Sequence, residues 1–279
     1  MKICIVMGAR KKGNTAQVVS CFTEALQERA DVSFDYLYPA DARPEHCVGC
    51  HNCIFTGEQH CPHHDTFRPM LQRLHEADAV ILASPGYMFS VTGIMKTFLD
   101  HMAYLCHRPE FFGKKALVLS SCTRWQQKSV LTPMTTWAAG AGFTLAGKFF
   151  VEMPPLPLKE KELERTRRKI RKEAARFAAE LQKPGKLKPV FADLMIFNAF
   201  RAFSRFAPGI LKADYAYFQS LHAYDRNTRW YRPVKVSRIK SRLAGYLTGR
   251  IMKSLKKMVD PVKLQEPGVS PVNSLTDRS

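Results

Sequence analysis

Short apolar runs alternate with longer segments of helical periodicity along the first 181 residues of this chain. The apolar runs cover residues 3–7, 32–37, 80–83, 116–120 and 149–151. The segments of helical character cover residues 15–29, 67–76, 93–105, 132–141 and 160–181. Continuous apolar strands between helices are typical of a parallel sheet with both faces covered, because each strand is then buried on both sides. The pattern therefore predicts an α/β domain built on five parallel strands.

Five strands, each followed by a helix, fit the flavodoxin-like doubly wound fold with strand order 2-1-3-4-5. The ligand crevice of such a sheet lies at the carboxyl ends of strands one and three. We therefore expect the loops after Met7 and Ala83 to bind a ligand.

The distribution of charge separates this domain from the rest of the chain. Residues 1–154 contain 15 Lys and Arg against 13 Asp and Glu, whereas residues 155–279 contain 28 against 11, so nearly all of the net charge of +19 lies in the second part. From composition and turn signals we predict three regions. These are a domain over residues 1–183, a basic, mainly helical extension over residues 184–265, and a disordered tail over residues 266–279.

We expect neither a transmembrane helix nor a signal peptide. The longest stretch without charge, residues 79–95, is shorter than the ~20 residues that a bilayer-spanning helix needs. The apolar run over residues 3–7 is followed by Arg10, Lys11 and Lys12 rather than by a cleavage site. The predicted location is cytoplasmic, with peripheral membrane contact as an alternative. In a reducing compartment, the eight cysteines are more readily metal ligands or core residues than disulfides.

The loop after the first strand has the composition of a phosphate site. Its sequence, residues 8–15, is GARKKGNT, and it leads into a helix. Unpaired N–H groups and the positive end of the helix dipole suit a phosphate monoester at such a position. The alternative is an ordinary strand-to-helix turn with Asn14 or Thr15 as the N-cap.

The loop after the third strand can supply backbone amides and an aromatic wall to a flat ligand. Its sequence, residues 83–91, is ASPGYMFSV, and a helix with Lys96 and Asp100 follows. The alternative is a plain connection with Tyr87 and Phe89 in the core, and with Lys96 and Asp100 as a solvated ion pair.

These two loops and the order of elements resemble the NADPH-dependent FMN reductase and iron-sulfur flavoprotein family over about the first 180 residues. By this resemblance, FMN would be held by three sets of residues. The phosphate would be bound by Arg10, Gly13, Asn14 and Thr15. The isoalloxazine ring would be lined by Pro85, Gly86, Tyr87 and Met88. The far side would be closed by Ser121, Cys122 and Thr123.

Four cysteines lie close together in the sequence after the second strand, with the spacing of an iron-sulfur motif. They are Cys47, Cys50, Cys53 and Cys61. Three thiols at consecutive x2 spacings can point at one centre, and a fourth completes a four-cysteine site. This compact spacing and Pro62 after the last cysteine favour a 4Fe–4S cluster over zinc, whose sites more often use two separated CxxC pairs. The spacing also resembles the cluster motif of iron-sulfur flavoproteins.

Structural zinc and a loop without metal remain open alternatives, and several histidines in the same loop could replace a thiol in a zinc site. In the order 2-1-3-4-5 the ends of strands two and three lie ~10 Å apart, so a cluster on this loop could approach the flavin. The other cysteines are predicted to be buried and inert; they are Cys4, Cys21, Cys106 and Cys122.

The basic extension contains two helical patterns. Phenylalanines recur at helical spacing over residues 191–206, and a second apolar stripe over residues 239–258 is interleaved with Lys and Arg. The stripe consists of Ile239, Leu243, Leu247, Ile251, Leu255 and Met258. We rank packing or homo-oligomerisation first, contact with an anionic membrane surface second and nucleic acid last, since no motif for specific nucleic-acid binding is present.

The sequence thus favours an FMN-dependent oxidoreductase that passes electrons between NAD(P)H or ferredoxin, FMN and a 4Fe–4S cluster. The flavin itself would be the reactive centre, since no side chain is an obvious acid, base or nucleophile. The alternative is a non-catalytic flavodoxin-like binding protein with a structural zinc loop, whose basic region binds a partner or a membrane.

Overall fold

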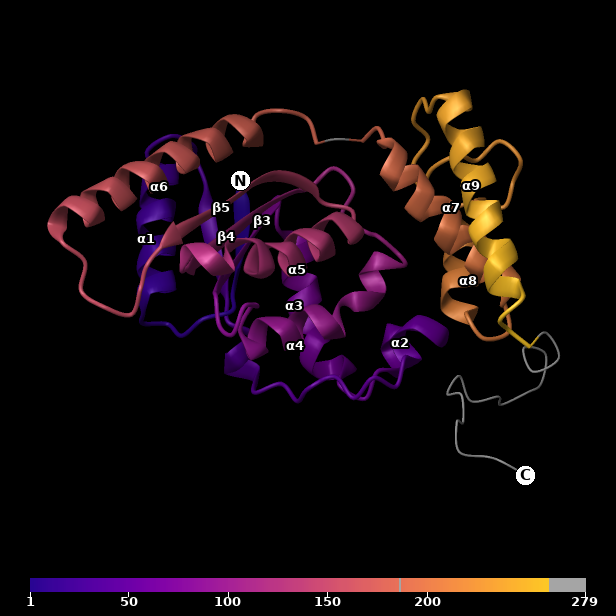
Figure 1. Ribbon diagram of the computed structural model, residues 1–279, viewed down its shortest axis with the longest axis horizontal. Helices are drawn as coiled ribbons and strands as arrows, with labels where there is room; N and C mark the ends of the chain where they lie inside the picture. The colour runs from indigo at the N-terminus through magenta and orange to yellow at the C-terminus, as the bar shows by residue number, and fades with distance from the viewer. Residues whose placement is uncertain (186, 261–279) are drawn as a thin grey trace. The chain divides into compact units, whose positions relative to one another are not determined.

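The computed structural model describes residues 1–185 and 187–260, which form two compact units (Figure 1). Unit 1 consists of Met1–Cys50 and Cys61–Leu187, and unit 2 consists of His51–His60 together with the chain from Lys188 onward. A short segment of the cysteine loop is thus grouped with the C-terminal helices. The predicted tail over residues 266–279 and the end of the predicted extension lie outside the described residues.

Unit 1 alternates strands and helices in the expected order. The strands are β1 (Lys2–Met7), β2 (Ser33–Leu37), β3 (Ala79–Pro85), β4 (Lys115–Cys122) and β5 (Thr144–Glu152). The α-helices are α1 (Asn14–Gln27), α3 (His64–Glu76), α4 (Gly93–His101), α5 (Gln127–Gly140) and α6 (Glu160–Leu181). Short 3-10 turns are η1 (Pro39–Ala42), η3 (Ala103–Cys106) and η4 (Arg124–Gln126).

The sheet has the order β2-β1-β3-β4-β5, and every pairing is parallel. This confirms the predicted flavodoxin-like order. Met7 pairs with Ala83 and Pro85 pairs with Ser121, so β1, β3 and β4 end side by side.

Helices cover both faces of the sheet, and the strands divide their side chains between them. Ile3, Ile5 and Ile81 share one core with buried residues of α1 and α6. Side chains alternate along a strand, so the buried Cys4 and Val6 face the opposite side, where α3, α4 and α5 lie (Figure 1). Two-sided burial is the reason that these strands appear in the sequence as continuous apolar runs.

Two elements are longer than the sequence pattern indicates. β5 starts at Thr144 rather than at residue 149, because its first half is an edge segment with mixed composition and its pairing with β4 is interrupted between Ala116 and Leu117. α5 starts at Gln127 rather than at residue 132 and contains Pro133 in its interior. A proline is favoured in the first turn of a helix, so its presence in the sequence suggests a later start.

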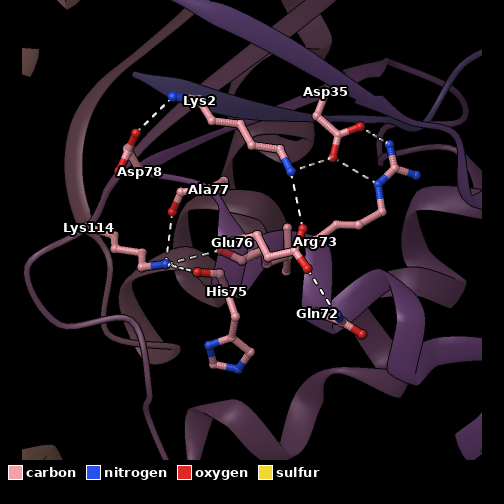
Figure 2. Close-up of polar contacts among 10 residues, drawn as sticks. Lys2, Asp35, Gln72, Arg73, His75, Glu76, Ala77, Asp78 and Lys114 are labelled. Carbon is pink, nitrogen blue, oxygen red and sulfur yellow. Dashed lines mark hydrogen bonds and ion pairs between the residues drawn. The ribbon is translucent and has the colours of Figure 1, made fainter.

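Two consecutive lysines at the start of β4 cap the C-terminal ends of two helices that lie on opposite faces of the sheet. The Lys114 ammonium donates to the carbonyl oxygens of His75 and, at 2.8 Å, of Ala77, at the end of α3 (Figure 2). The Lys115 ammonium donates to the carbonyl oxygens of Glu180 and Lys183 at the end of α6. Cations stabilise this end of a helix because its last carbonyl groups lack intrahelical partners.

An ion pair at the same edge joins β2 to α3. Arg73 donates to both carboxylate oxygens of Asp35, with its Nε 3.0 Å from Oδ2, and Lys2 lies 3.8 Å from the same carboxylate (Figure 2). The hydrogen bonds from Arg73 lower the pKa of Asp35. Charged contacts therefore tie β2 and the start of β4 to α3 at this edge of the sheet.

Unit 2 is helical, as predicted for the C-terminal region. It contains α7 (Phe191–Phe206), α8 (Lys212–Ser220) and α9 (Arg238–Lys256), together with α2 (Asn52–Phe55) and η2 (Glu58–His60) from the cysteine loop. α7 packs on α8 and α9, and α2 packs on α8. Its core is aromatic: the ring of Phe197 lies 5.9 Å from that of Phe218 and 4.7 Å from that of Tyr231.

Within residues 1–185 and 187–260, every helix is too short or too polar to cross a bilayer.

Replacement of Lys115 by Met should lower the free energy of unfolding by about 1–3 kcal/mol, because two partly buried carbonyl groups at the end of α6 lose a charged donor. Lys115 is 5% exposed. The matched control is Lys148→Met on β5, which is exposed and should change stability by less than about 0.5 kcal/mol. Equal denaturation midpoints for the two variants would show that Lys115 does not stabilise α6.

Candidate functional site

The loop after β1 meets the amino terminus of α1 without a side-chain cap. Gly13 is the N-cap with φ of 149°, and no side chain hydrogen-bonds to the first turn within the described structure. The expectation that Asn14 or Thr15 is the N-cap is therefore wrong. The first-turn N–H groups remain available to an anion, and the positive end of the helix dipole favours one there.

The side chains of this loop divide into an exposed group and an anchored group. Arg10 and Gly13 are exposed. Asn14 Nδ2 lies 3.4 Å from the carbonyl oxygen of Pro154, and the Thr15 hydroxyl lies 2.6 Å from the hydroxyl of Ser121. Arg10 can thus reach an anion at the helix terminus, while Thr15 and Ser121 connect the loop to the end of β4.

A chain of hydrogen bonds connects the loop after β1 with the segment after β3. Gly8 N donates to Ala83 O at 2.8 Å, and the Thr92 hydroxyl donates to Gly8 O at 2.6 Å. Thr92 also caps α4, since its hydroxyl oxygen accepts from Met95 N at 3.3 Å. A Cβ on Gly8 would lie 2.6 Å from Met95 Cβ, so only glycine permits this close approach. The two predicted ligand loops are therefore held in one arrangement.

The loop after β3 is a tight turn that presents large side chains to solvent. Tyr87 and Ser90 exchange backbone hydrogen bonds of 2.9 and 3.0 Å, while Met88 and Phe89 have φ of 47° and 54°. Tyr87 and Phe89 are each 59% exposed and Met88 is 91% exposed. The alternative that placed Tyr87 and Phe89 in the core is therefore wrong, and the turn offers an exposed apolar surface. Pro85 is the last residue of β3.

Gly86 lies against the loop after β4. Its N–H donates to Ser121 O at 3.2 Å, and a Cβ there would lie 2.7 Å from Cys122 Cβ and 2.5 Å from Gln126 Oε1. Ser121 and Cys122 are buried at the end of β4, where the Ser121 carbonyl oxygen and the Cys122 side chain lie beside Gly86.

Two further residues of the β4 loop, Trp125 and Gln126, lie near Gly86 and were not predicted from the sequence. Gln126 Oε1 is buried without a hydrogen-bond partner among the described residues, and Trp125 is 86% exposed. Both residues lie in η4, whose N-cap is Thr123. In the sequence, the large aromatic side chain of Trp125 shortly after a buried strand is the feature that could have indicated a ligand site here. The unpaired oxygen and the exposed aromatic side chains fit a flat ligand that has both hydrogen-bonding and apolar edges.

Lys96 and Asp100 do not contribute to the site. Their side chains form an exposed ion pair at 2.5 Å on one face of α4. This confirms the alternative that treated them as a solvated i,i+4 pair.

The four loop cysteines are divided between the two units. Cys47, Cys50 and Cys61 belong to unit 1, and Cys53 lies on α2 in unit 2. Cys47 and Cys50 are exposed, and Cys53 and Cys61 are partly exposed. Among the described residues, no group of three or more His, Cys, Asp or Glu is gathered closely enough to hold a metal ion.

Cys61 has a histidine beside it. His101 Nδ1 lies 3.8 Å from Cys61 Sγ, and His101 Nε2 lies 3.0 Å from the carbonyl oxygen of Glu45. His101 is 5% exposed, and burial lowers its pKa. Because a carbonyl oxygen only accepts, Nε2 carries the proton and a neutral His101 accepts from the Cys61 thiol.

The remaining cysteines lie within the core or beside it. Burial raises the pKa of Cys4 to about 12 and that of Cys106 to about 11. Burial also raises the pKa of Cys21 and of Cys122. Thiols with raised pKa values are poor nucleophiles at neutral pH. None of the eight cysteines, all of which lie in the described ranges, forms a disulfide.

A parallel sheet of order 2-1-3-4-5, with three loops gathered at one carboxyl edge, defines a flavodoxin-like protein. Residues 1–153 match the family described as NADPH-dependent FMN reductase, and this match covers more than half of the chain. The protein therefore belongs to the NADPH-dependent FMN reductase family.

Several curated proteins are similar in sequence to part of the chain. An iron-sulfur flavoprotein of Archaeoglobus fulgidus is 35% identical over 115 residues, which are 41% of this chain and 51% of that protein. The iron-sulfur flavoprotein MJ1083 of Methanocaldococcus jannaschii is 32% identical over 101 residues, which are 36% of this chain and 51% of that protein. The chain thus spans about half the length of the curated relatives that it matches.

Solved structures share the fold at low sequence identity. The FMN-dependent NADH-azoreductase of Bacillus anthracis, in complex with FMN, has a TM-score of 0.50 and 11% identity, with 63% of this chain and 99% of that chain covered. A flavone reductase has a TM-score of 0.50 and 14% identity, with 66% of this chain and 64% of that chain covered. These similarities show the fold alone.

Replacement of Gly8 by Ala should lower the free energy of unfolding by about 1–3 kcal/mol, because the added methyl group collides with Met95 and overpacks the contact between β1 and α4. The control is Gly93→Ala, where an added Cβ has no neighbour within 4 Å and alanine favours the helix. Urea denaturation of both variants tests this. A Gly8→Ala variant as stable as wild type would show that the two loops are not tightly joined.

Proposed function

We propose that this protein is an FMN-dependent oxidoreductase that passes electrons between NAD(P)H or ferredoxin, FMN and a 4Fe–4S cluster on the cysteine loop. Membership of the NADPH-dependent FMN reductase family supports the flavin part of this proposal. The cluster is supported by the spacing of the four cysteines and by relatives named iron-sulfur flavoprotein.

The observation that carries the flavin proposal is the uncapped amino terminus of α1 beside the exposed turn after β3. The strand register places Met7 next to Ala83, so the two loops start from neighbouring strands. A phosphate at the helix terminus and a flat ring against the turn fit a mononucleotide with one terminal phosphate, such as FMN.

Each loop has a separate task in this proposal. The backbone N–H groups at Gly13 and Asn14 and the guanidinium of Arg10 would hold the phosphate by charge-assisted hydrogen bonds. Thr15 would keep the helix terminus in place through its hydroxyl contact with Ser121.

The ring would be held by the loops after β3 and β4. The residues after β3 are Pro85, Gly86, Tyr87 and Met88, and those after β4 are Ser121, Cys122 and Thr123. Tyr87 and Met88 supply exposed apolar surface, which the ring would cover and remove from water.

Bound FMN would exchange a hydride with a nicotinamide and single electrons with a cluster. The role of the protein is to orient the ring and leave one face open, so no side chain needs to act as acid or base. The family name favours a nicotinamide as the donor, and reduced ferredoxin is the alternative. Stopped-flow reduction of the flavin by NADPH, NADH and ferredoxin in parallel identifies the donor.

A 4Fe–4S cluster would be ligated by Cys47, Cys50, Cys53 and Cys61 as thiolates. The exposure of Cys47 and Cys50 leaves these thiols accessible to iron. The alternative role for the loop is structural zinc in a non-catalytic protein. Bound iron and a visible flavin spectrum would support the oxidoreductase, whereas a colourless protein with zinc would support the non-catalytic alternative.

The protein should retain FMN rather than FAD, and Arg10→Ala with Asn14→Ala should weaken FMN binding by at least ~10-fold. The reason is that a charge-assisted phosphate contact contributes ~1.5–3 kcal/mol. Fluorescence titration of the apoprotein with FMN measures this change. The control double variant, Lys128→Ala with Lys148→Ala, removes two exposed polar side chains outside this loop. Unchanged affinity in the Arg10 and Asn14 variant would exclude this loop as the phosphate site.

Each Cys→Ala change in the loop should remove cluster iron while FMN stays bound, because the flavin loops come from other strands. Anaerobic reconstitution followed by iron and acid-labile sulfide analysis should give about four of each per wild-type chain, by the composition of such clusters. Electron paramagnetic resonance of the reduced protein should show the cluster signal. Cys21→Ala is the control, since Cys21 is partly exposed like Cys61 but lies outside the loop. One zinc per chain, or no metal, would contradict the cluster.

A further inference from the structure

α9 buries a different face from the one that its apolar stripe predicts. Ala244, Thr248 and Met252 are its buried residues, and α9 packs on α7. The larger apolar side chains of the stripe stay exposed: Ile239 is 79% exposed and Ile251 is 57% exposed. Leu247 and Leu255 are partly buried, so the packing of unit 2 uses only part of the stripe and leaves Ile239, Leu243, Ile251 and Met258 exposed.

The exposed residues continue along the helix surface opposite to Thr248. At 3.6 residues per turn, Ile239, Leu243 and Tyr246 lie on that surface in the first half of the helix. Leu243 is 49% exposed and Tyr246 is 63% exposed. Arg250 and Lys253 extend the same surface in the second half and are also exposed. We call this surface the outer face of α9.

The charge of α9 has one sign. From Arg238 to Lys256 the helix contains no Asp or Glu. Its cations are Arg238, Lys240, Arg242, Arg250, Lys253 and Lys256. Lys256 lies 5.1 Å from the ring centre of Phe206, and the other five are exposed. The outer face therefore combines aliphatic side chains with a cationic border.

We propose that the outer face of α9 binds the surface of an anionic lipid bilayer. This inference goes beyond the electron-transfer function and is independent of it. Cations next to exposed aliphatic residues fit such a surface, because anionic headgroups attract the cations while the aliphatic side chains enter the acyl boundary. Tyr246 suits the same boundary, since its ring is apolar and its hydroxyl group is polar.

Other occupants fit the outer face less well. A second copy of the chain would bring two surfaces of the same positive sign together, which charge repulsion opposes. A nucleic acid would attract the cations through its phosphates but would leave Ile239 and Leu243 in contact with polar groups. Of these three occupants, the lipid surface is the one that uses both the charge and the exposed aliphatic residues.

The test is co-sedimentation of the full-length protein with vesicles. Vesicles of equimolar phosphatidylcholine and phosphatidylglycerol should bind the protein, and binding should weaken as salt increases. Vesicles of phosphatidylcholine alone should bind it at least ~10-fold more weakly, because the attraction of the cations is lost. Equal binding to both vesicles, or no binding to either, would overturn the proposal.

Two sets of variants separate the apolar contribution of the outer face to membrane binding from its cationic contribution. Ile239→Gln with Leu243→Gln and Tyr246→Gln should reduce partitioning at least ~10-fold, because the burial of these apolar side chains is lost. Arg242→Gln with Lys253→Gln should reduce it by about 25-fold, at about fivefold per cation. All five side chains are exposed, so folding is preserved. The control is Leu145→Gln with Leu156→Gln and Lys148→Gln, three exposed residues of unit 1, which should leave partitioning unchanged.

Further outcomes identify the competing occupants. If duplex DNA displaces the protein from anionic vesicles at a lower concentration than added vesicles do, the surface binds nucleic acid and the proposal is wrong. If light scattering shows a dimer that the triple Gln variant of α9 loses, the occupant is a second copy and the proposal is equally wrong. Retention of FMN by every variant would show that neither result depends on the flavin site.

Discussion

The parallel register of β1, β3 and β4 is the constraint on which the candidate site depends. It pairs Met7 with Ala83 and Pro85 with Ser121, so three loops leave the sheet at neighbouring positions. Burial on both faces fixes this register, because a shift by one residue would exchange the side chains of the two cores. The apolar runs of the strands thus position loops that are themselves polar or exposed.

Close backbone contacts then hold these neighbouring loops together as one candidate site. Thr92 caps α4 and donates to Gly8 O, while Gly86 lies against Cys122 and Gln126. At both glycines the neighbouring atoms leave no room for a Cβ. The exposed turn after β3 can remain exposed because its base is held by these contacts rather than by burial of its own aromatic side chains.

The C-terminal unit follows a different packing rule. Its core is made of aromatic rings, and the fully buried residues of α9 are Ala244, Thr248 and Met252 rather than the aliphatic residues of its stripe. A helix that packs through Ala244 and Thr248 can approach α7 closely and still present larger residues outward. The positive charge of the chain is concentrated in the region that contains this outer face.

The sequence by itself determined the strand order and the helical C-terminal region, and it offered the ion pair of Lys96 with Asp100 as an alternative, because apolar periodicity and local spacing carry this information. Only the tertiary structure decided that Gly13 rather than Asn14 caps α1, that Tyr87 and Phe89 are exposed, and that Thr92 and Gln126 lie at the candidate site. It also decided which face of α9 is buried. These features depend on contacts between segments far apart in the chain, such as Thr92 with Gly8, and no local pattern specifies which residues will meet.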